Sequence, residues 1–349
     1  MVKLQMISTS RLQTAVRVCG DPDGIPVVLV HGNVSSSRFF QELMEMLPSL
    51  WYVLAPDLRG FGDSQRLPVD ASRGVGDYSD DLHSLIESVG LAGTPFHLLG
   101  WSLGGGVAMQ YAIDHPAQLA SLTLLAPVSP YGFGGTKGAD GAPCFPDYAG
   151  SGGGTANPEF VRRLGSRDAG QDNDASPRRV MNAFYFKPPF GVDEALESAY
   201  VAAMLKTAVG EGNYPGDATP SRNWPMIAPG KQGNNNAIAP GNFNTAAIAH
   251  MAPKPPILWV RGDSDQIVSD TSLFDLGFLG QIGAVPGWPG ADIFPSQPML
   301  LQTRAVLEEY AAKGGRYEEE VIENAGHSPH IEQPEAFLEA FAGFVRRNS

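Results

Sequence analysis

Residues 96–106 read FHLLGWSLGGG, and this stretch decides the fold. The short apolar run at 96–99 is typical of a strand buried on both faces of a parallel sheet, and a helical pattern follows at 103–113. The turn between them, GWSLG at 100–104, fits the pattern G-x-S-x-G. The sequence therefore predicts Ser102 as a nucleophile at a helix N-terminus, where free N–H groups favour an oxyanion.

Strands and helices alternate on both sides of this turn. Further apolar runs that predict buried strands lie at 26–30, 51–55, 121–126 and 257–261, with outer strands at 11–18 and 317–323. Helical spacing of apolar residues separates them at 39–47, 82–89, 299–313 and 334–347. Such alternation predicts an α/β fold with a mostly parallel sheet flanked by helices.

The alternation is interrupted by a long segment that is rich in glycine, proline and asparagine. Between 131 and 254 only two helices are predicted, at about 158–167 and 192–208. We therefore expect three parts: an N-terminal core at 1–130, an inserted cap or lid at 131–254, and a returning core at 255–349. A second Gly/Pro-rich apolar stretch at 273–298 either roofs the same site or covers an oligomer interface, which would make the protein a homo-oligomer.

A serine hydroxyl needs a base that takes its proton. Of the seven histidines, His327 follows the last predicted strand and precedes the last helix, which is where such a base belongs. We assign structural roles to the others, which are His31, His83, His97, His115, His250 and His330.

The imidazole needs a carboxylate that orients it and stabilises its protonated form. Residues 261–268 (RGDSDQIV) follow the strand at 257–261 and offer two aspartates. Asp265 is our choice, and Asp263 is expected to make hydrogen bonds within the turn. The order Ser102, Asp265, His327 is the one that this arrangement requires.

Two backbone N–H groups must bind the oxyanion that forms during acyl transfer. One is that of Leu103, which follows the nucleophile. The other should come from the loop HGNV at 31–34, where Gly32 lets the chain turn over the site and Asn33 supplies its N–H.

On five motifs the sequence resembles the α/β hydrolases, in the capped branch that includes esterases and epoxide hydrolases. The motifs are HGN at 31–33, DLRGFGDS at 57–64, GWSLG at 100–104, GDSD at 262–265 and GHSP at 326–329. The resemblance implies the same roles for the triad and for the two N–H donors, and it places a cap where the insertion lies. Epoxide-opening relatives use an aspartate nucleophile, so Ser102 implies a serine acyl-enzyme instead.

Composition excludes several other classes of protein. The 37 acidic and 24 basic residues give a formal net charge of −13, which disfavours nucleic acid and anionic membranes as partners. Two cysteines, Cys19 and Cys144, provide no disulfide framework, and no metal or cofactor motif occurs. Because residues 1–10 lack the apolar segment of a signal peptide, we expect a cytoplasmic protein.

The expected activity is hydrolysis of a carboxylic ester or lactone in a small, largely apolar molecule. Trp101 beside the nucleophile and Phe186 and Trp224 of the insertion are the predicted substrate-binding residues, because ligand sites are mostly apolar clefts. Two alternatives stay open. Carbon–carbon bond hydrolysis of a diketone-type acid would use an arginine of the insertion (Arg162, Arg163, Arg178 or Arg179), and a ligand receptor would keep the triad without turnover.

Overall fold

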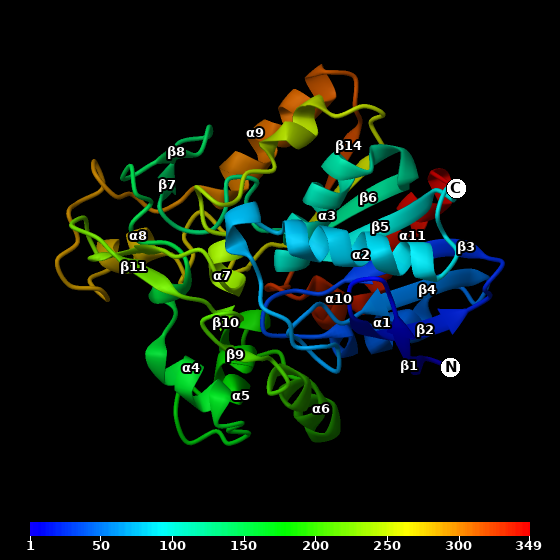
Figure 1. Ribbon diagram of the computed structural model, residues 1–349, viewed down its shortest axis with the longest axis horizontal. Coiled ribbons are helices and arrows are strands. Elements are labelled where there is room, and N and C mark those ends of the chain that lie inside the picture. Colours follow the sequence, from blue (N-terminus) through cyan, green and yellow to red (C-terminus); the bar gives the residue numbers. More distant parts are fainter.

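One eight-stranded sheet organises the chain, with strand order β1-β2-β4-β3-β5-β6-β13-β14 (Figure 1). The computed structural model describes residues 1–349. β1, β2 and β4 pair antiparallel, and all other neighbours pair parallel. The strands are β1 Lys3–Ser8, β2 Gln13–Gly20, β3 Ile25–Val30, β4 Trp51–Pro56, β5 Phe96–Trp101, β6 Leu119–Leu125, β13 Ile257–Gly262 and β14 Tyr317–Ile322. The predicted α/β fold with a mostly parallel sheet is confirmed.

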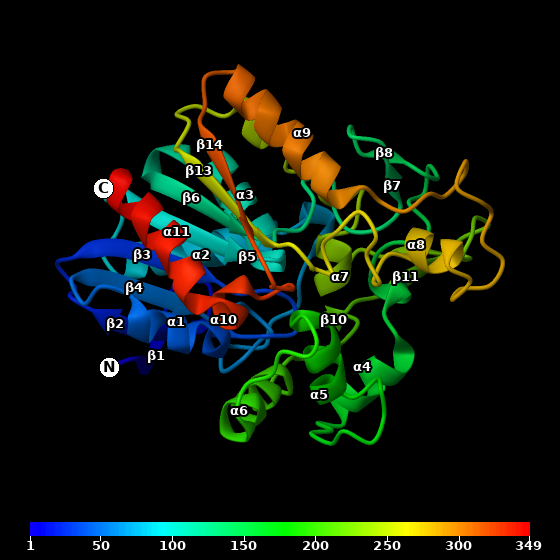
Figure 2. The same ribbon diagram turned by 180° about the vertical axis from the view of Figure 1, so that it is seen from behind.

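Helices cover both faces of this sheet. Figure 1 shows α2 and α3 in front of it, and Figure 2 shows α11 and α1 in front of the opposite face. The core helices are α1 Gln41–Met46, α2 Gly76–Ser88, α3 Leu103–Asp114, α9 Met299–Ala312, α10 Pro329–Glu332 and α11 Pro334–Arg347, with short 3-10 turns η1 Ser37–Phe40, η2 Ala71–Arg73 and η3 Pro116–Gln118.

The central strands bury their side chains on both faces. In β3, Val27 and Leu29 belong to the core cluster that contains α1 and α11, while Val28 and Val30 belong to the cluster that contains α2, α3 and α9. Alternation of side chains along a strand sends successive residues to opposite faces, so a strand between two helical layers must be apolar throughout. This explains why unbroken apolar runs predicted these strands.

The sequence analysis missed β1. This strand lies at the sheet edge, pairs only with β2, and has almost entirely exposed side chains. Without a buried face it carries no hydrophobic periodicity, which is the signal on which sequence-based prediction depends.

The segment between β6 and β13 contains short elements only. They are β7 Thr136–Lys137, β8 Ala142–Pro143, η4 Gly153–Thr155, α4 Pro158–Gly165, α5 Pro177–Val180, η5 Met181–Tyr185, α6 Glu194–Met204, β9 Val209–Gly210, β10 Tyr214–Pro215, β11 Ala218–Pro220, β12 Ile227–Pro229, α7 Asn234–Ala237 and η6 Ala246–His250. η5 has π-helical geometry. In Figures 1 and 2 the helices α4, α5 and α6 group together beyond the sheet, on the side where α8 (Leu276–Gln281) also lies.

The insertion has no core of its own that is separate from the sheet. Phe160 and Tyr200 share one core cluster with strand residues such as Leu29, and Phe243 and Ile248 lie in the cluster around α3. The division of the chain at 131–254 stays a prediction. No helix is long and apolar enough to cross a membrane.

Candidate active site

Ser102 occupies a strained turn between β5 and α3. Its backbone has φ 58° and ψ −117°, a region that residues other than glycine rarely adopt. The turn fits only because its neighbours lack side chains. A Cβ on Gly32 would lie 2.9 Å from Ser102 Cβ, and a Cβ on Gly104 would lie 2.2 Å from the carbonyl oxygen of Val30. Backbone strain that the surrounding contacts hold in place is typical of a functional site.

His327 and Asp265 form a buried pair. His327 Nδ1 lies 2.8 Å from Asp265 Oδ2, and both side chains are almost fully buried. The other oxygen of Asp265 accepts the N–H groups of Ile267 at 2.8 Å and Val268 at 3.0 Å. The carboxylate is thus fixed by its own loop. Trp101 Nε1 donates to the carbonyl of His327 at 2.8 Å, which ties the histidine loop to the serine turn.

Ser102 and His327 line the same cavity, whose volume is about 570 Å³. No hydrogen bond joins the Ser102 hydroxyl to the His327 ring in this structure. Such bonds are often long in enzymes without substrate and shorten in the complex. The three side chains predicted from sequence are therefore brought together at the carboxyl ends of β5, β13 and β14.

Two backbone N–H groups beside Ser102 have no acceptor within the chain. They belong to Asn33 and Leu103, and both residues line the cavity. Leu103 is the first residue of α3, where helix geometry leaves the amide unpaired. Free N–H groups that face a cavity can bind a developing negative charge.

Asp263 lies apart from the histidine. Its oxygens accept hydrogen bonds from the Ser264 hydroxyl at 2.7 Å and from the N–H of Asn324 at 3.1 Å. Partial burial raises the pKa of this carboxyl, but these hydrogen bonds outweigh it and hold the pKa below its ordinary value. The expected bond within the turn is thus joined by a second one, to the loop that precedes His327.

The cavity is mostly apolar, and three segments build it. Trp101 lines it, as predicted. The insertion contributes Phe160, Val180, Phe184, Tyr185 and Tyr214, the segment after β13 contributes Ile267, Val268, Leu273, Phe274, Leu276 and Leu279, and the core contributes Val34 and Val128. The apolar stretch at 273–298 thus roofs the cavity with its first residues.

Phe186 and Trp224 do not line the cavity, which corrects their prediction as substrate-binding residues. Phe186 is buried and packs against Phe190, with ring centroids 5.4 Å apart. Trp224 packs against Phe294 and donates its Nε1 to the carbonyl of Pro286 at 3.0 Å. Apolar content alone does not tell which aromatic side chains of an irregular segment face inward.

Glu332 is a site residue that the sequence analysis missed. Its carboxylate accepts the N–H of Gly326 at 2.9 Å and that of Ser328 at 3.2 Å, one on each side of His327. It also accepts the N–H of Lys187, in the insertion, at 2.6 Å. Burial raises the pKa of Glu332. No sequence signal marked it, because residues 328–333 read SPHIEQ and a glutamate is unremarkable in such a polar stretch.

Two other histidines near the site have structural contacts. The His31 ring accepts the N–H of Leu58 at Nε2 (3.0 Å) and places Nδ1 2.8 Å from the carbonyl oxygen of Gly32, so it braces the loop that carries Asn33. His330 is buried between Phe40 and Trp101, and burial lowers its pKa to about 3. No group of three or more His, Cys, Asp or Glu side chains could hold a metal ion.

Comparison with known proteins agrees with this geometry. The model of the alpha/beta hydrolase family matches residues 27–340. A monoacylglycerol lipase of Xenopus laevis is 34% identical over 109 residues, or 31% of this chain and 32% of the lipase. A pimeloyl-[acyl-carrier protein] methyl ester esterase of Neisseria meningitidis is 38% identical over 109 residues, or 30% of this chain and 38% of the esterase. The matched segments thus span about a third of these curated relatives.

Solved structures match the fold over the whole chain. Esterase RhEst1 from a Rhodococcus species has a TM-score of 0.61 and 18% sequence identity, covering 100% of this chain and 99% of the esterase. The carboxylesterase CesB of Bacillus subtilis has a TM-score of 0.58 and 16% identity, covering 98% of this chain and 92% of the carboxylesterase. At these identities the match establishes the fold.

Proposed function

The chain belongs to the alpha/beta hydrolase family, and we propose that it is a serine hydrolase that cleaves carboxylic ester or lactone bonds in a small, uncharged, largely apolar substrate. One observation carries the proposal. Ser102 stands on a strained turn in the same cavity as the His327–Asp265 pair and two unpaired N–H groups. The ester-hydrolysing relatives support it.

The reaction follows from this arrangement. The Ser102 hydroxyl attacks the carbonyl carbon of the ester while His327 Nε2 takes its proton, and the oxyanion is bound by the N–H groups of Asn33 and Leu103. Asp265 stabilises the imidazolium that forms. His327 then gives the proton to the departing alkoxide, which leaves as an alcohol. The acyl group stays bound to the Ser102 oxygen as the acyl-enzyme. Water, deprotonated by the same histidine, attacks the acyl carbon and releases the carboxylic acid and Ser102.

The lining of the cavity supports an uncharged substrate. No lysine or arginine lines it. Its single carboxylate outside the triad, Asp174, has a solvent-exposed side chain and pairs with Arg179 at 3.1 Å. An anionic group bound in this apolar space would lose its hydration without gaining a partner, which is costly.

The positions of the candidate arginines do not support the alternative of carbon–carbon bond hydrolysis. All four arginines that were candidates for binding a substrate carboxylate pair with acidic residues of the insertion. Arg162 and Arg163 bind Glu159, Arg178 binds Glu197, and Arg179 binds Asp174. None of the four lines the cavity.

We also propose that the insertion at 131–254 acts as a cap. Five of its apolar or aromatic residues cover the space over Ser102, together with the segment after β13. A roof that excludes water strengthens the electrostatic interactions beneath it. Chain-length preference should therefore depend on residues such as Phe184 and Tyr214, which line the cavity.

The test is the variant Ser102→Ala, assayed on nitrophenyl esters with acyl chains of increasing length. We expect activity to fall by at least about 10³-fold with an unchanged melting temperature, because the hydroxyl is small and triad members act as a unit. A fluorophosphonate probe should label Ser102 in the native protein. Labelling of another residue, or activity retained in Ser102→Ala, would refute the proposed nucleophile. Absence of turnover by the native protein on every ester tested would favour the receptor alternative instead.

A further inference from the structure

The loop that carries Asn33 is held in a strained conformation. Val34, which is buried, has φ 43°. A β-branched residue at positive φ is a genuine outlier, so surrounding contacts must maintain it. This conformation sets the peptide group between Asn33 and Val34, so the contacts that hold this group and the Asn33 side chain limit how Asn33 itself can turn.

The core holds only the first peptide group of this loop. The carbonyl of Gly32 accepts the Ser35 hydroxyl at 2.7 Å. In a trans peptide the carbonyl and the following N–H point in opposite directions, so this bond aims the Asn33 N–H away from Ser35.

The insertion holds the next two peptide groups. The Tyr185 hydroxyl lies 3.0 Å from the carbonyl oxygen of Asn33 and 3.2 Å from that of Val34. Tyr185 ends the π-helical turn η5, and its ring lies against Trp101 and His327, with centroids 6.0 and 6.3 Å away. Burial raises the pKa of this hydroxyl, so it keeps the proton that it donates.

The insertion also holds the Asn33 side chain. Asn234 Nδ2 donates to Asn33 Oδ1 at 2.6 Å, and Asn33 Nδ2 donates to Asn235 Oδ1 at 3.0 Å. Asn234 is itself fixed, because the Tyr78 hydroxyl donates to its Oδ1 at 2.7 Å. Asn33 Oδ1 also accepts the N–H of Val34, in the loop itself, at 2.9 Å. The side chain of Asn33 therefore has a partner in the insertion at each of its polar atoms, besides this local bond.

We propose that Tyr185 and Asn234 are positioning residues that hold the Asn33 N–H in the geometry that binds the oxyanion, so that the insertion completes the transition-state site as well as covering it. This inference rests on the proposed serine hydrolase function and on Asn33 as oxyanion donor. Hydrogen bonds that pre-organise such a donor act on the transition state and not on the bound substrate.

The test is Tyr185→Phe, which removes the hydroxyl and keeps the ring packing. Loss of the one proton that this hydroxyl shares between two carbonyl oxygens is expected to lower kcat about 10-fold, with KM within about 2-fold. Affinity for a trifluoromethyl ketone, which forms the tetrahedral adduct, should weaken by the same factor as kcat. The matched control is Tyr200→Phe, also in the insertion, whose hydroxyl binds Glu42 at 2.9 Å and does not touch the loop; its kcat should equal that of the native enzyme.

A second variant, Asn234→Ala, removes the bond from the insertion to Asn33 Oδ1 and keeps the bond from the Val34 N–H to the same oxygen. It should also lower kcat and ketone affinity together, and the double variant should lose less than the product of the two single losses, because both act on one loop. An unchanged kcat in both single variants overturns the inference, as does a rise in KM alone. If the fluorophosphonate probe does not label Ser102, the proposed serine hydrolase function fails. If the probe labels Ser102 and kcat is unchanged in the variants, only the positioning role fails.

Discussion

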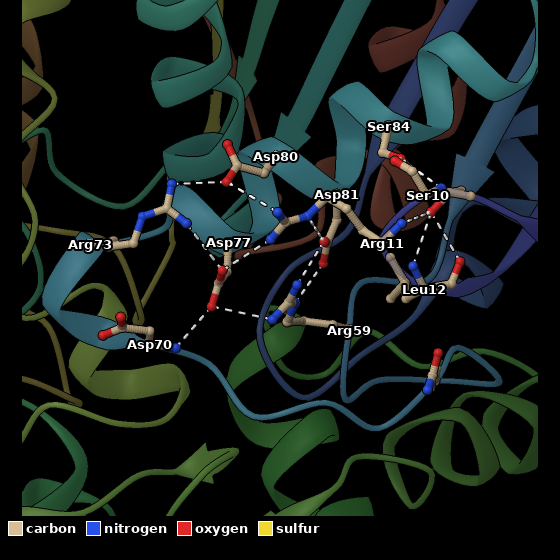
Figure 3. Close-up of polar contacts among 12 residues, drawn as sticks. Ser10, Arg11, Leu12, Arg59, Asp70, Arg73, Asp77, Asp80, Asp81 and Ser84 are labelled. Atoms are coloured by element: carbon tan, nitrogen blue, oxygen red, sulfur yellow. Dashed lines mark hydrogen bonds and ion pairs between the residues drawn. The ribbon is translucent and has the colours of Figure 1, made fainter.

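Two clusters of polar side chains, both largely shielded from solvent, differ in how completely their groups are paired. One is a charged cluster at the start of α2 (Figure 3). Arg59 binds both oxygens of Asp81, at 2.5 and 2.7 Å, and its remaining nitrogen lies 2.9 Å from the carbonyl of Pro68. Arg11 pairs with Asp77, Asp80 and Asp81, and Arg73 pairs with Asp77 and Asp80, which completes the cluster.

The other cluster, around Ser102, leaves specific groups unpaired. The N–H groups of Asn33 and Leu103 have no acceptor, and the Ser102 hydroxyl is not bound to His327. The two carboxylates that support the histidine loop are nevertheless paired: both oxygens of Asp265 and the carboxylate of Glu332 accept hydrogen bonds.

The difference separates a structural cluster from a reactive one. A charged cluster whose every group has a partner gains nothing from a ligand, and it fixes the loop at 57–64 against α2. In a pre-organised site, the residues that hold the reactive groups have hydrogen-bond partners of their own, while the groups at the centre have none. Such a site is ready for a ligand that supplies the missing partner. The predictions below test this distinction, from the largest expected effect to the smallest.

The largest effect is expected at Asp265. Asp265→Asn should lower kcat/KM by about 10⁴-fold, because a neutral amide does not stabilise the imidazolium and favours the wrong tautomer of His327. The matched control Asp263→Asn should retain most of the activity, since that carboxylate bonds to the Ser264 hydroxyl and to the N–H of Asn324 and not to His327. Steady-state kinetics on a nitrophenyl ester measure both. The reverse ranking would show that Asp263 is the triad acid.

In the charged cluster, stability should change instead of activity. Arg59→Met leaves two buried carboxylates short of a partner and should lower the free energy of unfolding by about 3 kcal/mol. The control Arg347→Met breaks an exposed pair with Glu318 and should cost no more than about 1 kcal/mol. Urea unfolding measures both variants. A stable Arg59→Met protein with reduced kcat would mean that the charged cluster serves the reaction.

Glu332 should give an intermediate result, because it supports the site without contacting substrate. Glu332→Gln replaces one accepting oxygen by an NH₂ group that faces N–H donors, which should cost about 1–3 kcal/mol. We expect a lower melting temperature together with slower fluorophosphonate labelling of Ser102, since the backbone on both sides of His327 loses a partner. Normal labelling in a destabilised protein would reduce Glu332 to a purely structural residue.

The smallest effect concerns pH. Burial lowers the pKa of His330 to about 3 in the folded protein, against about 6.5 in the unfolded chain. Between these values only the unfolded chain binds the proton, so stability falls as pH decreases through this window. His330→Phe, whose ring suits the aromatic surroundings, should flatten the dependence of melting temperature on pH between 4 and 6.5. Burial also lowers the pKa of His97, so part of the slope should remain.

A slope that His330→Phe leaves unchanged would assign the acid sensitivity to other groups. The native protein provides the reference slope. Both measurements use melting temperatures at several pH values.

The sequence by itself determined the fold class and suggested the central chemistry. Buried strands of a parallel sheet must be apolar on both faces, so each leaves a local run of residues, and the turn at Ser102 requires glycines at fixed spacing. Because parallel strands end at one edge of the sheet, Ser102, His327 and Asp265 could be proposed as one site before any coordinates. Asp265 and Asp263 stand two positions apart; the structure pairs Asp265 with His327, and the catalytic role of Asp265 stays a prediction.

Only the tertiary structure decided which insertion residues reach the site. Tyr185 lines the cavity and its neighbour Phe186 does not, although both are aromatic. Tyr185 lies 152 positions from Asn33, and Asn234 lies 201 positions away, inside a stretch whose composition indicated only irregular structure. Such contacts depend on how an irregular segment packs over the sheet. No local periodicity records that packing, because hydrogen bonds between distant loops leave no repeating pattern along the chain.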